Sequence, residues 1–372
     1  MTGLPAQIFG ICKSVGTSVF TWVLGAGRLY VAMGALGLGG LAVVYGLMQM
    51  SVGSGEVQTI DVVEGQFFEI ATGPVTGTYY PLGNAIASVI SNPAGSVRCI
   101  DETRCGPPGL IAVVQTSAGS VENVEALHSG RVHSAFAQAN VVNSAYRPSD
   151  ASLPSYDGLR AISGLYTEVI HLVVLQNSDI QVLGDLRGHR VSVDRPGSGT
   201  FGITQQILTT QGISARNTEL LELSADQATE RLVNGEIDAF FFVAGPPVRA
   251  VAELANAYPV RLIPIEGPAV DELVSAEPYL TSAQIDEGAY RDTTAVQTIG
   301  VPALWIVDRD ADYETVYRIT SALWNPANRP MLEEGPLQAH TMQLETALDG
   351  VPIPFHPGAS AFYREIGLFP SE

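Results

Sequence analysis

Three short segments of this sequence combine glycine with serine or threonine, and each joins a strand-like run to a helix-like run. They are Thr76-Gly77-Thr78-Tyr79, Thr116-Ser117-Ala118-Gly119-Ser120 and Ser198-Gly199-Thr200. Glycine lets the backbone approach a ligand closely, while serine and threonine cap a helix or donate to a ligand oxygen. A helix N-terminus presents unpaired N–H groups and partial positive charge, which suit a carboxylate or a phosphate. The alternative for each segment is simple helix capping.

Five further side chains are candidates for the same site. Gln138 ends a strand-like run, where its amide can donate and accept hydrogen bonds, or it is an ordinary edge residue. A bound carboxylate needs a positively charged partner, and the guanidinium group of arginine can bind it through two parallel hydrogen bonds. Arg195 is either that partner or part of a surface ion pair, and the same choice holds for Arg249. His171 either faces the cleft or lies in the core, where it would be hydrogen-bonded to Glu168. Phe242 belongs to a run of phenylalanines that is expected to form a buried strand, and the alternation of side chains along a strand would turn one of these rings to the opposite face.

Composition and missing motifs exclude several classes of function. The formal charge is −19, which argues against nucleic acid as a partner. Lys13 is the only lysine and precedes the apolar segment, so Schiff-base chemistry is not expected. No phosphate-binding loop with its lysine, no G-x-S-x-G elbow and no cluster with metal-ligand spacing occurs. We therefore expect no enzyme, no cofactor and no metal.

The chain from residue 60 onward alternates strand-like and helix-like segments, which predicts an α/β fold with mostly parallel sheets. Its length suggests two α/β lobes, and the long apolar runs 159–176 and 296–307 are candidates for strands that cross between them. The expected lobes are 60–165 plus 300–372, and 166–299. Ligands of such folds bind beyond the carboxyl ends of the strands, here in a cleft between the lobes.

The N-terminal part has a different character. Residues 29–50 carry no charge and are long enough to span a bilayer, between a cytoplasmic extension at 1–28 and a linker at 51–59. We expect a retained signal anchor, with a removed signal peptide as the alternative. Both predict that the remaining chain lies outside the cytoplasm, where Cys99 and Cys105 are most simply a disulfide.

Several ordered sequence blocks resemble the TAXI family, the solute-binding proteins of one branch of TRAP transporters. They include GTYYPLGNAIA, TSAGSVENVEAL, DRPGSGT and TIGVPALWIV, within residues 67–367. The resemblance implies a type II periplasmic-binding-protein fold and a receptor that delivers a small anionic solute, an organic acid or acidic amino acid, to TRAP permease subunits in the inner membrane. Family ligand contacts would map onto residues 76–79, 116–120, 138, 198–200 and 240–245. The alternatives are a membrane-tethered ligand sensor and an enzyme on the same fold.

Overall fold

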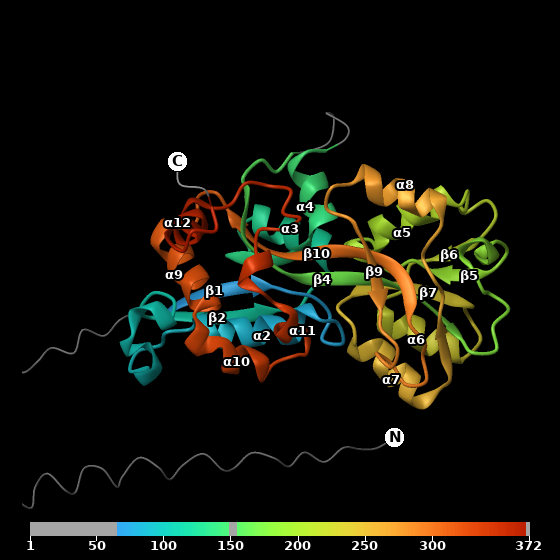
Figure 1. Ribbon diagram of the computed structural model, residues 1–372, viewed down its shortest axis with the longest axis horizontal. Helices are drawn as coiled ribbons and strands as arrows, with labels where there is room; N and C mark the ends of the chain where they lie inside the picture. Colours follow the sequence, from blue (N-terminus) through green and yellow to red (C-terminus); the bar gives the residue numbers. More distant parts are fainter. Residues whose placement is uncertain (1–64, 149–154, 370–372) are drawn as a thin grey trace, which may run out of the picture. The chain divides into compact units, whose positions relative to one another are not determined.

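The computed structural model describes residues 65–148 and 155–369, in which strands and helices alternate along much of the chain (Figure 1). The strands are β1 (Gln66–Ala71), β2 (Leu110–Gln115), β3 (Ser134–Gln138), β4 (Leu159–Leu175), β5 (Arg190–Ser192), β6 (Glu219–Leu221), β7 (Ala239–Ala244), β8 (Val260–Leu262), β9 (Thr281–Ile285) and β10 (Val296–Asp308). The helices are α2 (Tyr79–Ile90), α3 (Ser120–His128), α4 (Ala139–Tyr146), α5 (Gly199–Thr210), α6 (Ala225–Val233), α7 (Arg249–Ala257), α8 (Pro268–Ala276), α9 (Tyr313–Trp324), α10 (Arg329–Glu333), α11 (Gln338–Thr341) and α12 (Pro357–Glu365). The predicted mixed α/β class is confirmed.

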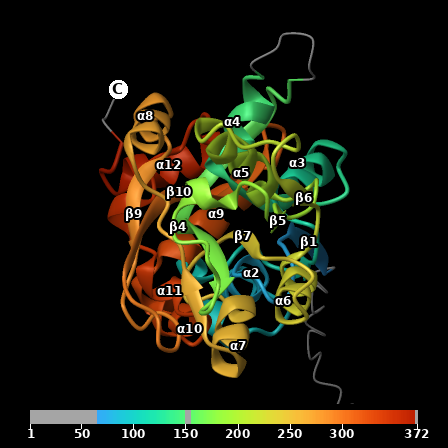
Figure 2. The same cartoon turned by 90° about the vertical axis from the view of Figure 1, so that its right-hand side faces the viewer.

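One sheet runs through the described residues, in the order β2-β1-β3-β10-β4-β7-β5-β6. Its centre is the antiparallel pair of β4 and β10, which the view in Figure 2 shows side by side. On one side, β1 lies parallel to β2 and β3, and on the other, β5 lies parallel to β6 and β7. The C-terminal half of β10 pairs with β3, whereas the C-terminal half of β4 pairs with β7. The two central strands therefore connect the β2-β1-β3 group to the β7-β5-β6 group.

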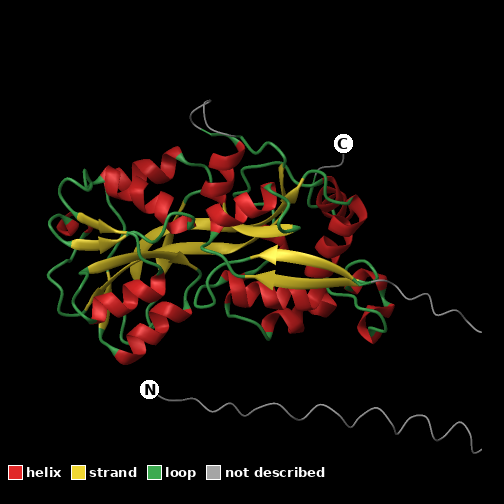
Figure 3. Ribbon diagram, turned by 180° about the vertical axis from the view of Figure 1, so that it is seen from behind, coloured by secondary structure: helices red, strands yellow, loops and turns green. Residues whose placement is uncertain are grey.

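Helices cover both faces of this sheet (Figure 3), because its inner strands are apolar on both sides. All residues of β3 and β7 are buried. One apolar cluster joins α3, α4, α5 and α8 to one face across both strand groups. The other face carries two clusters, one that includes α2 and α9 and one that includes α6 and α7. The core is thus continuous on one face and divided on the other.

The long apolar runs of the sequence form β4 and β10, as expected for connecting strands, while the division into two lobes stays a prediction. The extension at 1–28, the apolar segment at 29–50 and the linker at 51–59 lie outside the described residues. Within the described part, no helix has both the length and the apolar character needed to span a membrane. Cys99 and Cys105 form a disulfide, with their Cα atoms 5.5 Å apart.

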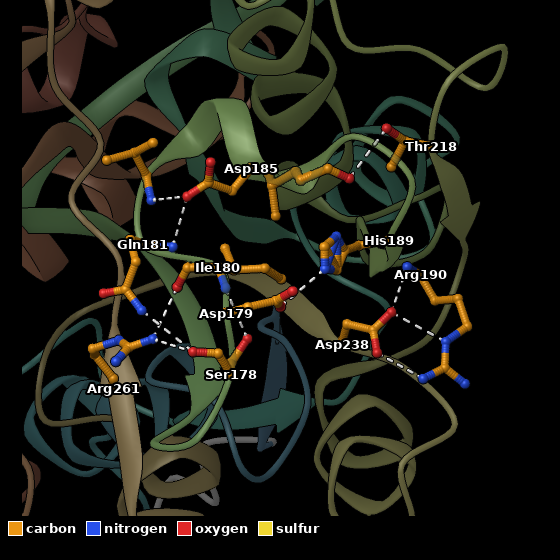
Figure 4. Close-up of polar contacts among 12 residues, drawn as sticks. Ser178, Asp179, Ile180, Gln181, Asp185, His189, Arg190, Thr218, Asp238 and Arg261 are labelled. Atoms are coloured by element: carbon orange, nitrogen blue, oxygen red, sulfur yellow. Dashed lines mark hydrogen bonds and ion pairs between the residues drawn. The ribbon is translucent and has the colours of Figure 1, made fainter.

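Polar contacts fix the strand ends in the β7-β5-β6 group (Figure 4). Arg190 of β5 holds the Asp238 carboxylate through Nη2 and Nε at 2.6 and 3.1 Å. This bidentate contact lowers the pKa of Asp238 and connects β5 to the residue that immediately precedes β7. Arg261 of β8 donates to the carbonyls of Ser178 and Ile180 at 2.8 and 2.9 Å. The contact between Arg190 and Asp238 thus fixes the start of β5, whose other end leads to the segment around Ser198, while Arg261 fixes the residues that follow β4.

Candidate ligand-binding site

A cavity of about 40 Å³ lies at the carboxyl ends of the parallel strands, between the two strand groups. Its wall combines the segments after β1, β2 and β5 with the ends of β3 and β7 and one residue of β4. The lining residues are Gly73, Pro74, Gly77, Thr78, Tyr79, Ala118, Gly119, Ser120, Gln138, Glu168, Asp194, Ser198, Gly199, Thr200, Phe242, Val243 and Ala244. Each of the three predicted glycine-containing segments therefore contributes to one cavity.

Three helices begin at this cavity, since Tyr79, Ser120 and Gly199 are the first residues of α2, α3 and α5 and all line it. Two of these helices come from the β2-β1-β3 group and one from the β7-β5-β6 group. Their dipoles add partial positive charge from both sides. The three helix N-termini that were expected to converge on one site therefore do so in this fold.

The chain itself already supplies oxygens to two of the three helix ends. The Gly197 carbonyl accepts hydrogen bonds from Val121 N and Glu122 N, at 3.0 and 3.1 Å, in the first turn of α3. Ser198 Oγ accepts from Phe201 N at 3.1 Å in the first turn of α5. Thr78, by contrast, does not cap α2, and its hydroxyl donates instead to the Gly245 carbonyl at 3.2 Å. The start of α2 is therefore the end best able to receive a solute oxygen.

Glu168 is a buried acid in the cavity wall and was not among the predicted ligand contacts. Only 2% of its surface is exposed, and its carboxylate accepts hydrogen bonds from Tyr79 Oη at 2.9 Å and Tyr166 Oη at 3.2 Å. Burial raises the pKa of this carboxyl to about 7, although hydrogen bonds from Tyr79, Gln138 and Tyr166 act in the opposite direction. Its one sequence signal is that it is the only acidic residue in the sequence of β4.

Asp194 is the second acid in the wall, and it too was missed. It adopts the left-handed region with a φ of 65°, which aspartate tolerates better than most residues. Its carboxylate accepts from Arg195 N at 2.7 Å. Burial raises the pKa of Asp194 to about 6, against the effect of this bond and of side-chain hydrogen bonds from Ser198 and Thr200. Its position four residues before Ser198, where the third glycine-containing segment begins, was the available signal.

Most of the predicted contacts line the cavity, namely Gly77, Thr78, Tyr79, Gly119, Ser120, Gln138, Ser198, Gly199, Thr200 and Phe242. Thr76, Thr116 and Ser117 do not. Thr76 is half-buried, and its hydroxyl donates to Asp226 Oδ1 at 2.7 Å. Thr116 is exposed, and Ser117 is engaged with Asn123 Oδ1 at 2.6 Å. Small hydroxyl residues of one segment thus have different roles, which their type does not reveal.

Neither candidate arginine lines the cavity. Arg195 is half-buried next to Asp194, while Arg249 forms an exposed ion pair with Glu253 at 2.6 Å. Among the described residues, the charged side chains of the cavity wall are both acidic. The expectation of a positive side chain facing the solute is therefore not met in this structure.

His171 is a core residue and does not line the cavity. Its Nδ1 lies 3.1 Å from the Val169 carbonyl and 3.2 Å from the Phe242 carbonyl, which requires a proton on Nδ1. Its Nε2 then accepts from Tyr290 Oη at 2.7 Å, and Tyr290 accepts from Val248 N. Burial lowers the pKa of His171 to about 4. The core alternative holds, but the partner is Tyr290 rather than Glu168.

Comparison with known proteins identifies one matching family and several similar structures. A sequence profile described as the NMT1-like family matches residues 70–367. The periplasmic aliphatic sulphonate binding protein SsuA from Escherichia coli is 12% identical, with 81% of this chain and 84% of that chain covered and a TM-score of 0.40. A putative L-cystine ABC transporter from Listeria monocytogenes is 14% identical, with coverages of 75% and 98% and a TM-score of 0.45. The periplasmic binding protein BugD is 10% identical, with coverages of 81% and 97% and a TM-score of 0.47.

Proposed function

The chain belongs to the NMT1-like family, and on this premise we propose that it is an extracytoplasmic solute receptor that captures a small organic acid or acidic amino acid. It is a binding protein and not an enzyme. It delivers its solute to a membrane permease of the TRAP type, as the resemblance to the TAXI family implies. The observation that carries this proposal is the convergence of α2, α3 and α5 on one cavity between the two strand groups.

The small cavity and the contacts around it support capture by closure of two lobes. A water molecule needs roughly 10–15 Å³ of such space, so about 40 Å³ holds only a few non-hydrogen atoms. Contacts that join the two strand groups beside the cavity include the bond from Val121 N to the Gly197 carbonyl and the bond from Thr76 to Asp226. A whole organic acid therefore enters only when these contacts open. Residues 60–165 plus 300–372 form one lobe and 166–299 the other, with bending in β4 and β10.

The site of action follows from the N-terminal segment together with the family. Residues 29–50 hold the protein at the periplasmic face of the inner membrane, or direct its export if they are removed. The cavity then faces the periplasm, and the solute passes to permease subunits in the same membrane. A disulfide between Cys99 and Cys105 fits this oxidising compartment.

Thermal unfolding of the full chain in detergent, with a solute panel, tests the receptor proposal. The panel contains L-glutamate, L-aspartate, 2-oxoglutarate, succinate and an alkanesulfonate, with sodium chloride at equal ionic strength as the control. We expect at least one solute to raise Tm, because a ligand at 100 times its Kd adds about 2.7 kcal/mol to the stability of the folded state. A panel in which no solute exceeds the salt control contradicts the proposal.

The permease class needs an experiment of its own. Crosslinking in the native membrane, followed by mass spectrometry of the partners, is expected to recover TRAP-type permease subunits. Recovery of ABC-type permease subunits instead would contradict the TRAP assignment and leave the receptor function in place.

A further inference from the structure

We propose that the solute of this receptor carries a positively charged N–H group, such as an ammonium, which binds against Asp194, Glu168 and the amide oxygen of Gln138. This inference rests on the proposed function and narrows its solute class from organic acids in general to acids that also bear a cation. Four observations on the cavity wall lead to it.

The first observation is the sign of the charge in the wall. Asp194 and Glu168 line the cavity with 6% and 2% of their surfaces exposed, and no basic side chain of the described residues lines it. The groups bonded to Glu168 are two tyrosine hydroxyls and an amide, which are neutral. Burial destabilises the charged form of each carboxylate, Arg195 outside the wall offsets part of this effect for Asp194, and a solute cation in the cavity would relieve the remaining cost.

The second observation concerns the end of α5, where a solute carboxylate was expected. The carboxylate of Asp194 already interacts there with Arg195 N and with the hydroxyls of Ser198 and Thr200. Thr200 in turn accepts from Val243 N at 3.1 Å, so this network is satisfied within the chain. A second anion at this position would face the charge of Asp194. The anionic end of the solute is therefore directed away from α5 and toward the start of α2.

The third observation is a buried acceptor without a donor. Gln138 is 3% exposed, and its Oε1 has no hydrogen-bond partner among the described residues. The same amide hydrogen-bonds Glu168, so it cannot turn freely to exchange its two ends. The amide oxygen lies against Gly199, at the boundary of the two strand groups. An N–H group of the solute would supply the missing donor.

The fourth observation is size. A space of about 40 Å³ accepts an ammonium and its neighbouring carbon, but not a whole dicarboxylate. The acid-lined space is thus matched to the cationic head of a solute, with the remainder of the solute placed where the contacts between the two strand groups open.

Matched pairs of solutes that differ only in the amino group test this inference on the unmodified full chain in detergent at pH 8. The pairs are L-glutamate with 2-oxoglutarate and L-alanine with pyruvate, and the readout is Kd from isothermal titration calorimetry. We expect the aminated member of at least one pair to bind at least tenfold more tightly than its oxo analogue. Equal or tighter binding of the oxo acid would overturn this inference and leave the receptor function intact. If neither these acids nor the others in the panel bind, the inference and the receptor proposal both fail.

Two charge-removing variants locate the preference in the cavity. Asp194→Asn and Glu168→Gln are each expected to reduce the preference for the aminated member to threefold or less, while binding of the oxo acid stays equal or improves. A variant that only damaged the structure would weaken both members alike. Asp310→Asn and Glu287→Gln remove the same charges at exposed positions and are expected to keep the wild-type preference. An unchanged preference in both cavity variants would refute the assignment.

Discussion

A methyl group added at position 199 should clash with the opposite strand group and push the two strand groups apart. Gly199 begins α5 in one group, and Gln138 ends β3 in the other. A Cβ built on Gly199 would overlap Gln138 Oε1 and Cδ and would lie 2.9 Å from Gln138 Nε2. Gln138 cannot simply move aside, because it is buried and hydrogen-bonded to Glu168. Gly199→Ala must therefore displace this amide or separate the walls of the cavity.

The magnitude follows from a matched substitution in the same helix. A Cβ added at Gly202 would meet no other atom within 4 Å, so Gly202→Ala carries the usual gain without a clash. Replacing glycine by alanine at a compatible site stabilises by about 0.4–1 kcal/mol through the unfolded chain, and overpacking costs about 1–3 kcal/mol. Because the gain cancels in the comparison, Gly199→Ala should be less stable than Gly202→Ala by about 1–3 kcal/mol.

Urea unfolding at 25 °C of both variants measures this difference, and the solute panel measures its effect on binding. A second substitution, Gln138→Ala, removes the clashing atoms and should abolish most of the difference between the Gly199→Ala chain and its matched control. Equal stability of Gly199→Ala and Gly202→Ala would refute the claim that the two strand groups meet at this point.

Three further outcomes follow from single groups of the structure. The raised pKa of Glu168, about 7, means that its proton is held more tightly in the folded state, so its contribution to stability is complete below about pH 4.5 and is lost as pH rises through 7. Glu168→Gln should flatten the fall in unfolding free energy between pH 5 and pH 8 while Glu287→Gln leaves it unchanged, and an equal slope in both variants would count against the buried carboxylate. Reducing the Cys99–Cys105 disulfide should cost about 2–4 kcal/mol and lower Tm, whereas an unchanged Tm in dithiothreitol would show that the link does not constrain the unfolded chain. Tyr290→Phe removes the hydroxyl between a buried histidine and a backbone N–H and should cost about 1–3 kcal/mol in urea unfolding without changing Kd; a loss of affinity at unchanged stability would contradict its purely structural role.

Local signals were enough to place the helices that begin at the cavity. Each of the three glycine-containing segments was expected to lead into a helix, and α2, α3 and α5 indeed begin at Tyr79, Ser120 and Gly199. The two long apolar runs likewise became β4 and β10. Helix starts and apolar periodicity depend on neighbouring residues in the chain, so the sequence carries them directly.

Two elements of the second half of the chain were not predicted. The strand β9 has four of its five residues exposed or half-buried and reads TSAQI, without the apolar alternation that marks a strand. It forms because β10 extends beyond β3 and offers it a free edge. The helix α8 begins with Gly267-Pro268, a helix-start signal that was present and overlooked.

The sequence by itself determined the α/β class, the long central strands and the three helix starts, because each depends on residues close together in the chain. Only the tertiary structure decided that the cavity wall is acidic. Glu168 lies in the wall because it pairs with Val301 of β10 and directly precedes Val169, where the pairing of β4 with β7 begins. Asp194 and Gln138, from opposite strand groups, also line this wall. The sign of the charge that a solute meets depends on which strand ends lie together, and that is fixed by the pairing order of the sheet and not by any short stretch of sequence.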